Sequence, residues 1–151
     1  GEMYMNISEI TNENMIQLNL SAKSKKDAIE ELCDVLYTNG KLIDKKKFVK
    51  AVLKREKKVS TGIGMGIAVP HAKSRYAKEA SFAFGRSTDG IDFKSIDGTP
   101  AHFIFLIAVP EGADQEHLDI LSGITMKLMH EEIRNSIYNA QSASDILKIL
   151  E

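Results

Sequence analysis

The sequence predicts an α/β fold in which strands and helices alternate along a single domain. Three observations support this prediction. The chain has 151 residues, a usual length for one domain. Apolar runs of strand length alternate with longer segments of helical periodicity, a pattern typical of a largely parallel or mixed sheet. The run HFIFLIAVP at 102–110 is almost entirely apolar, as expected of a central strand covered on both faces.

The first predicted elements are a strand and a helix. MIQLNL at 15–20 has strand character, and the segment at 24–40 has helical spacing and ends on a glycine that suits a helix stop. Ser24 and Asp27 resemble a capping box at the start of this helix. Its apolar face carries Ile29, Leu32, Cys33 and Leu36. We therefore interpret Cys33 as a small core residue rather than a reactive thiol.

A second helix is predicted to follow Asp44, a good N-cap, and to run to about Lys57. Its apolar face carries Phe48, Val49, Val52 and Leu53. At about 100° per residue, Glu56 projects near the middle of this face and Arg55 lies at its edge. A carboxylate that faces inward needs a partner. Two interpretations remain open at this point: both side chains extend to water where the helix ends, or both belong to a functional site.

Further strands and helices are predicted after the glycine segment, from residue 67 onward. They are strands at 67–70 and 81–85, the central run, a helix capped by Asp114, a turn or helix around Ile133 and Ile137, and a last short helix. Ser142 and Asp145 mark the start of that last helix. The helix after Asp114 is predicted to carry one apolar side, composed of Leu118, Leu121, Thr125, Leu128 and Met129.

Composition and charge argue against several classes of protein. The net charge of −1 gives no general attraction to nucleic acid or anionic lipid. Cys33 is the only cysteine, so no internal disulfide is expected, which fits a reducing compartment. We expect no membrane insertion and no secretory signal, and we expect Gly1 and Glu2 to be a cloning remnant. Basic side chains gather between 41 and 58. A solvated helix face explains them more simply than a docking patch.

Neither a nucleotide site nor a metal site is predicted. Gly62, Gly64 and Gly66 have G-x-G-x-G spacing between a helix and a strand, whereas a dinucleotide-binding loop needs G-x-G-x-x-G between a strand and a helix. These glycines are better explained by positive φ angles and close backbone packing. The four histidines and the lone cysteine show no metal-ligand spacing. We therefore expect no metal and no cofactor.

His71 is the most distinctive candidate for chemistry. It follows Pro70, which we expect to end a strand, and a polar loop is expected after it; strand exits are where α/β proteins place functional groups. The sequence also repeats itself, because IAVPH at 67–71 resembles IAVPE at 107–111. If the two strands are parallel and close, His71 would meet the segment that contains His117. The alternative is that apolar strands commonly exit through proline, in which case the repeat has no functional meaning.

The segment EKKVSTGIGMGIAVPHA at 56–72 resembles the signature of a known family. It is similar to the type-2 enzyme IIA domains of the bacterial phosphoenolpyruvate-dependent sugar phosphotransferase system, the fructose–mannitol family. The resemblance continues through SKKDAIEEL, LKRE, AFGRSTDGIDFKSIDGTPAHFIFLIAVPEGADQEHL and SASDILKI, and so covers nearly the whole chain. The segments at 84–87 and 98–102 look most like fructose-type members. Ala72 stands where many relatives have glycine, although alanine also occurs there.

The resemblance implies a fold, a reaction and a role for each site residue. The fold is a mixed, mostly parallel sheet flanked by helices, in a single domain over 1–151. His71 matches the histidine that accepts a phosphoryl group from the carrier protein HPr and passes it to an enzyme IIB domain. His117 matches a second histidine beside the phosphoryl group, and Arg55 matches an arginine that contacts it.

The implied function is a phosphotransferase relay in sugar uptake, of the fructose type. Such a protein is expected to be cytoplasmic and to associate with a membrane transporter complex. An alternative within the same family is a nitrogen-type regulatory paralogue, in which phosphorylation changes partner binding. The two alternatives share all three site residues, so the site cannot separate them.

Overall fold

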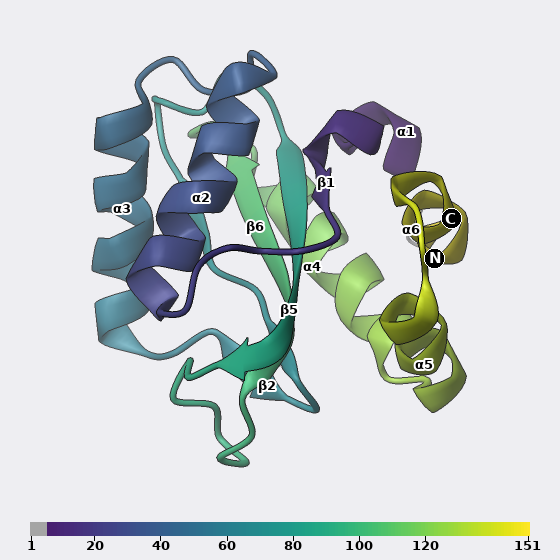
Figure 1. The fold of residues 1–151 in the computed structure, drawn as a ribbon. Coiled ribbons are helices and arrows are strands. Elements are labelled where there is room, and N and C mark those ends of the chain that lie inside the picture. The colour runs from purple at the N-terminus through teal and green to yellow at the C-terminus, as the bar shows by residue number, and fades with distance from the viewer. Residues whose placement is uncertain (1–5) are drawn as a thin grey trace.

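A mixed sheet with helices on both faces forms the centre of the protein (Figure 1). The computed structural model describes residues 6–151; Gly1 and Glu2 lie outside this range. The helices are α1 (Ile7–Ile10), the 3-10 helix η1 (Glu13–Met15), α2 (Lys25–Thr38), α3 (Lys45–Lys58), α4 (Asp114–Leu128), α5 (Glu131–Asn139) and α6 (Ala143–Leu150). The strands are β1 (Ile16–Gln17), β2 (Gly62–Gly64), β3 (Ile67–Ala68), β4 (His71–Lys73), β5 (Ser81–Ile91) and β6 (Ala101–Val109).

The sheet is organised around β6. The strand order is β1-β5-β6-β3-β2, and β4 also pairs with β6. The pairs β1–β5, β3–β6 and β4–β6 are parallel, whereas β5–β6 and β2–β3 are antiparallel. The predicted α/β class, with a mixed and mostly parallel sheet flanked by helices, is therefore confirmed.

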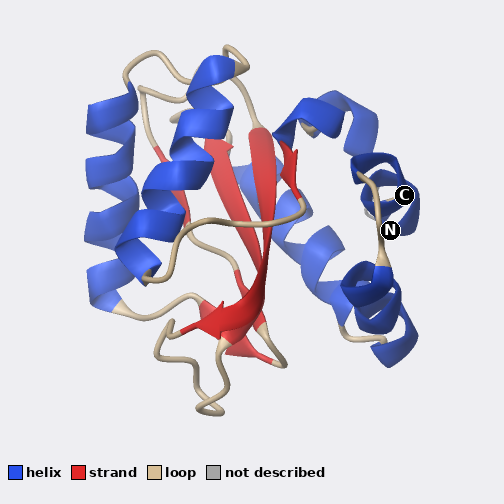
Figure 2. Cartoon of the chain, viewed as in Figure 1, coloured by secondary structure: helices blue, strands red, loops and turns tan. Residues whose placement is uncertain are grey.

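Two apolar layers enclose β6, as its continuous apolar sequence predicts. Ile104, Leu106 and Ala108 pack with α2 and α3 on one face. Alternate residues, including Phe103 and Phe105, pack with α4, α5 and α6 on the other face, as the two groups of helices in Figure 2 show. Side chains alternate across a strand, so a strand buried on both faces must be apolar throughout. Cys33 belongs to the first layer, and burial raises the pKa of its thiol, which confirms it as a core residue.

Three predicted helix starts are confirmed by their caps. The Ser24 side chain accepts the N–H of Asp27 at 3.2 Å, and Asp44 accepts that of Lys47 at 3.0 Å. Ser142 accepts the N–H of Asp145 at 3.0 Å at the start of α6. Each bond satisfies a backbone donor that the first helical turn leaves without a partner.

The glycine segment forms a tight turn between β2 and β3. Gly64 and Gly66 have φ angles of 91° and 78°, so the positive φ values predicted for this segment are confirmed at these two positions. The N–H of Met65, between them, donates to the carboxylate of Asp97 at 2.9 Å. The turn is therefore held by an internal carboxylate.

Two predictions are wrong: the length of the first strand and the capping role of Asp114 at the start of α4. The strand predicted at 15–20 is only Ile16–Gln17, because Asn12 caps a preceding 3-10 turn that includes Met15. Asp114 is the first residue of α4 and makes no capping bond; its carboxylate pairs with Lys73 instead.

The apolar side of α4 also differs from the prediction. Leu128 is buried as predicted, and Leu121 packs against the same core. Ile120 and Ile124 are also buried, although they were not predicted, whereas Leu118 and Met129 are 55% and 65% exposed. The helix carries two apolar stripes, and the periodicity alone does not say which one the sheet covers. His117 lies one helical turn before Ile120 and is therefore on the side of α4 that faces the sheet.

Arg86 joins the sheet to the C-terminal helices. From β5, its Nε donates to the carbonyl of Leu18 at 3.0 Å. Its Nη1 donates to the carbonyls of Ile137 at 2.9 Å, Tyr138 at 3.3 Å and Ala140 at 2.7 Å. The last carbonyls of a helix lack partners within the helix, so this guanidinium closes the end of α5.

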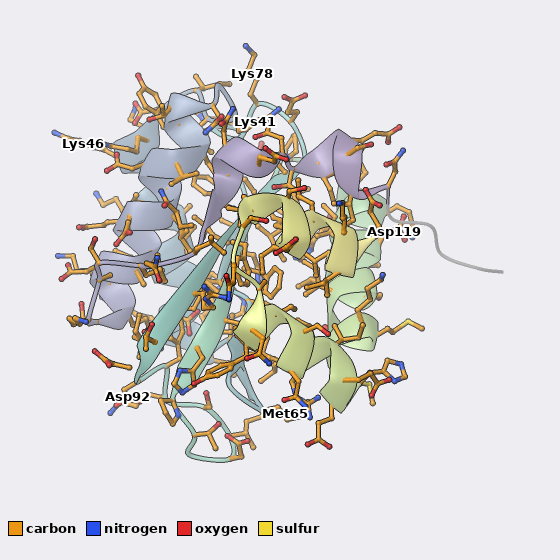
Figure 3. The ribbon with its side chains drawn as sticks, turned by 45° about the vertical axis from the view of Figure 1, so that its right-hand side comes forward. Lys41, Lys46, Met65, Lys78, Asp92 and Asp119 are labelled. Atoms are coloured by element: carbon orange, nitrogen blue, oxygen red, sulfur yellow. The ribbon has the colours of Figure 1, made fainter. Side chains whose placement is uncertain are left out.

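We expect Arg86→Met to lower the free energy of unfolding by about 3 kcal/mol, because hydrogen bonds from a charged donor to half-buried carbonyls are lost. Urea unfolding followed by circular dichroism measures the change. Lys78→Met is the matched control, since Lys78 is exposed and projects from the surface (Figure 3). Equal stability of the two variants would contradict this role for Arg86.

No helix between residues 6 and 151 combines the length and apolar composition needed to cross a membrane.

Candidate functional site

The strand that carries His71 continues past Pro70, in contrast to the prediction. Ile67 lies beside Phe103 and His71 beside Ile107, so β3 and β4 keep one parallel register along β6. Pro70 has no N–H to donate, which interrupts the ladder, but its carbonyl accepts the N–H of Ile107 at 3.0 Å. His71 is therefore the first residue of β4 rather than a loop residue. The two IAVP segments do lie on parallel neighbouring strands, as their repetition suggested.

The His71 imidazole is held in one tautomer by its own backbone. Its Nδ1 lies 2.9 Å from the carbonyl oxygen of Val69. A carbonyl oxygen only accepts, so Nδ1 carries the hydrogen and Nε2 keeps its lone pair. Burial lowers the pKa of His71, and the nearby Arg55 and Lys73 cations lower it further, against opposing contributions from the Val69 carbonyl and Glu56. The His71 imidazole is thus neutral near pH 7, and its Nε2 lone pair is chemically able to act as a nucleophile.

His117 lies against His71. The two ring centroids are 4.8 Å apart, with the planes inclined by 45°. The His117 Nε2 is buried and has no hydrogen-bond partner among the described residues. Burial lowers the pKa of His117, and the neighbouring His71 and Lys73 lower it further. The structure therefore brings together the two histidines that the sequence repeat paired.

A cationic cleft of about 560 Å³ contains both histidines and Arg55. Arg55 lies at the C-terminal end of α3, and its Nη1 donates to the Val59 carbonyl at 2.8 Å. The basic side chains that line the cleft are Lys54, Arg55, Lys58, Lys73 and Arg75. Among the residues that line the cleft, one is acidic, Glu111. This excess of cations around a neutral imidazole suits a multiply charged anion.

Glu56 is a structural neighbour of this cleft. Its buried carboxylate pairs with Lys25 at 3.0 Å and accepts the Thr61 N–H at 2.8 Å and the Thr61 hydroxyl at 2.5 Å. The interpretation in which Glu56 extends to water is therefore wrong. Its bonds fasten the end of α3 to the segment before β2, which fixes the backbone from which Arg55 projects.

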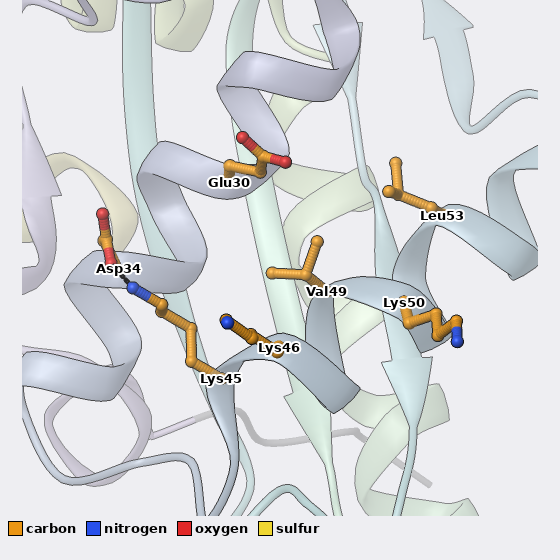
Figure 4. Close-up of a pocket in the computed structure, with 7 residues that line it drawn as sticks. All are labelled: Glu30, Asp34, Lys45, Lys46, Val49, Lys50 and Leu53. Atoms are coloured by element: carbon orange, nitrogen blue, oxygen red, sulfur yellow. Dashed lines mark hydrogen bonds and ion pairs between the residues drawn. The ribbon is translucent and has the colours of Figure 1, made fainter.

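A second hollow lies between α2 and α3 (Figure 4) and has a different character. Its volume is about 530 Å³, and its lining consists of Glu30, Asp34, Lys45, Lys46, Val49, Lys50 and Leu53. Lys45 is already paired with Asp34 at 2.6 Å. No imidazole lines this hollow, so the cleft around His71 is the stronger candidate.

Sequence reasoning did not assign Lys73 or Arg75 to the site, and it interpreted the basic stretch that contains Lys54 and Lys58 as a solvated helix face. Lys73 is two residues after His71, and residues i and i+2 share one face of a strand. That signal can be used only if the strand is known to continue past Pro70. The remaining histidines lie outside the cleft: His102 Nδ1 bonds to the Ser87 carbonyl at 2.8 Å, and His130 is exposed.

Fold and cleft together define an α/β domain that places a neutral imidazole, a second imidazole and several cations at one edge of its sheet. The chain belongs to the family described as "Phosphoenolpyruvate-dependent sugar phosphotransferase system, EIIA 2", whose sequence profile matches residues 9–151. Members of this family are phosphotransferase components of a phosphoryl relay, and this chain is one of them.

Curated relatives share most of the chain. It is 45% identical to the fructose-specific EIIABC component of Bacillus subtilis over 97% of its own length and 23% of the length of that protein. It is 38% identical to the fructose-specific EIIA component of Haloferax volcanii, over 95% of this chain and 94% of that protein. The chain thus spans under a quarter of the first relative and nearly all of the second.

Solved structures confirm the fold. The nitrogen regulatory protein IIA-Ntr of Neisseria meningitidis is 34% identical, has a TM-score of 0.90, and the match covers 96% of this chain and 99% of that one. The IIA mannitol protein of Escherichia coli is 24% identical with a TM-score of 0.82, over 93% of this chain and 99% of that one. The second likeness supports the fold alone.

Proposed function

We propose that the protein accepts a phosphoryl group from phosphorylated HPr on Nε2 of His71 and passes it to an enzyme IIB domain. The observation that carries this proposal is the bond from Nδ1 of His71 to the Val69 carbonyl at 2.9 Å. It leaves Nε2 as the nucleophilic nitrogen of a ring that lines the cationic cleft.

In the proposed transfer, the P–N bond of the donor breaks as a P–Nε2 bond forms on His71. The electron pair of the broken bond stays with the imidazole of the donor, so no other reactant is needed. Nδ1 keeps its hydrogen, and the Val69 carbonyl stabilises the positive charge that develops on the ring. Onward transfer to the IIB domain reverses these roles.

Phosphoryl transfer requires mainly positioning and stabilisation of charge on the equatorial oxygens. The Arg55 guanidinium, which lines the cleft with His71, offers a planar fork of donors for these oxygens. His117 offers its Nε2, which is buried without a partner in the described structure. We assign both residues to phosphate binding. A docked partner protein would exclude water and protect the phosphohistidine from hydrolysis.

Several similarities support a role in sugar uptake of the fructose type. The relatives in Bacillus subtilis and Haloferax volcanii are both named as fructose-specific components. A solved complex from Escherichia coli pairs the IIA mannitol enzyme with its phosphorylated IIB enzyme. By analogy, the IIB partner of this chain would dock over the cleft, in the cytoplasm and next to a membrane transporter.

A nitrogen-type regulatory function is the second candidate. It is favoured by the likeness to IIA-Ntr at a TM-score of 0.90, and by 33% identity over 132 residues to the nitrogen regulatory protein of Bradyrhizobium diazoefficiens. Such a protein would use the same phosphorylation of His71 as a switch for partner binding.

One reconstituted relay tests both candidates. The protein is mixed with phosphoenolpyruvate, enzyme I and HPr, and its intact mass is measured before and after addition of a fructose-type IIB domain. We expect the gain of one phosphoryl group and its loss to the IIB domain. Acceptance without transfer to the IIB domain would favour the nitrogen-type function, and failure to accept phosphate would overturn both candidates.

The lowered pKa of His71 predicts how acceptance depends on pH. Protonation of Nε2 removes the nucleophilic lone pair, so the rate falls as pH drops through the pKa of His71. Because burial lowers that pKa below its ordinary value of about 6.5, the rate from purified phospho-HPr should begin to fall only at a lower pH than it would with an exposed histidine. NMR titration of His71 measures the pKa directly. A midpoint above the ordinary value would contradict the prediction.

A further inference from the structure

Four side chains join β4 to α4 through two contacts. His71 and Lys73 share one face of β4, because they are two residues apart. Asp114 and His117 are neighbours on the surface of α4, because they are three residues apart. The Lys73 ammonium pairs with the Asp114 carboxylate, and the two imidazoles lie against each other with centroids 4.8 Å apart. The strand and the helix are thus joined by two adjacent contacts.

The Lys73–Asp114 contact is open to solvent. The two side chains are 44% and 71% exposed, and an exposed ion pair of this kind is weak and screened by salt. Lys73 also lines the cleft with His71 and Arg55. Its Cα lies about 6.6 Å along the strand from that of His71, a separation that an extended lysine side chain can span.

We propose that Lys73 is a ligand of the phosphoryl group on His71, and that Asp114 holds this lysine while His71 is unphosphorylated. The proposal rests on the function proposed above. A phosphoryl group brings a charge of about −1.5 to −2, against −1 for the carboxylate. It is also placed inside the cleft, whereas Asp114 is exposed and readily solvated. Lys73 therefore moves from Asp114 to the phosphoryl oxygens.

The charge of Lys73 already reaches both imidazoles. Lys73 contributes to lowering the pKa of both His71 and His117, whereas Asp114 raises the pKa of His117. Release of Lys73 leaves the Asp114 carboxylate uncompensated at the first turn of α4, next to the exposed Leu118. The phosphorylated and unphosphorylated proteins would therefore differ in surface charge at the mouth of the cleft.

The test compares Lys73→Met and Asp114→Asn with wild type, and uses Lys46→Met as a matched control. Lys46 is exposed on α3 and lies outside the cleft (Figure 3). The equilibrium ratio of phosphorylated protein to phospho-HPr is measured by intact mass at low salt. We expect Lys73→Met to lower the ratio about tenfold, because a cation is lost from the phosphate site. Asp114→Asn should raise it about twofold, because it releases Lys73, and Lys46→Met should not change it.

A second measurement distinguishes a Lys73 that binds the phosphoryl group from a Lys73 that only links β4 to α4 through Asp114. In a ³¹P NMR titration, loss of a cationic ligand raises the pKa of the phosphoryl group. Lys73→Met should therefore raise this pKa and Asp114→Asn should lower it, while Lys73→Arg should remain close to wild type. If Lys73→Met matches wild type in both measurements, or if both variants shift in the same direction, the proposal is overturned. Failure of wild type to take up phosphate would instead overturn the function on which it rests.

Discussion

Replacement of His71 by alanine is expected to reduce phosphoryl acceptance from phospho-HPr to the background of the assay. The reason is that the nucleophilic Nε2 is lost, while the cationic cleft around it remains. The side chain is only half-buried, so the fold should persist, which circular dichroism can verify. Acceptance is measured as the fraction of protein with one added phosphoryl group.

Two histidine variants serve as controls for this result. His130→Ala should accept phosphate at the wild-type rate, because His130 is exposed and lies outside the cleft. His117→Ala should still accept phosphate on His71, with slower onward transfer, because a donor to the phosphoryl oxygens is removed. Acceptance at the wild-type rate by His71→Ala would refute the assignment of the nucleophile.

Removal of the Arg55 guanidinium should slow phosphoryl transfer by about 100- to 1000-fold, the usual effect of losing a principal charge-stabilising donor. Arg55→Lys keeps the charge but not the planar fork, so we expect it to be partly active. The rate constant is measured with purified phospho-HPr as donor.

Lys57→Ala is the matched control for Arg55→Ala. Lys57 is an exposed cation on the same helix and does not line the cleft. Arg55 also donates to the Val59 carbonyl, so urea unfolding is needed to show that the end of α3 remains intact in each variant. Normal transfer by a folded Arg55→Ala protein would show that Arg55 is not a phosphate ligand.

The elements that could be predicted from the sequence are those that local chemistry determines. The caps at Ser24, Asp44 and Ser142 are bonds between residues three positions apart, so a short segment contains all of the information. The burial of β6 could likewise be read from its continuous apolar residues. The approach of His71 and His117 was suggested by the repeated IAVP, because parallel neighbours deliver their ends to one edge of a sheet.

What could not be predicted depends on contacts between distant segments. Proline usually ends a strand, yet β4 resumes after Pro70 because β6 supplies partners on the far side of the interruption. Without that continuation, the position of Lys73 beside His71 cannot be inferred. The buried stripe of α4 is chosen by the sheet beneath it, so periodicity alone could not distinguish Leu118 from Ile120.

The central claim is that Nε2 of His71 carries the phosphoryl group, and NMR of the ¹⁵N-labelled phosphorylated protein tests it most directly. Coupling between ³¹P and ¹⁵N identifies the bonded nitrogen, and sequential assignment identifies the residue. Because the Val69 carbonyl retains the hydrogen of Nδ1, we predict a single phosphohistidine, at His71, with phosphorus bonded to Nε2. Phosphorus on Nδ1 of His71, or on His117, would contradict the account.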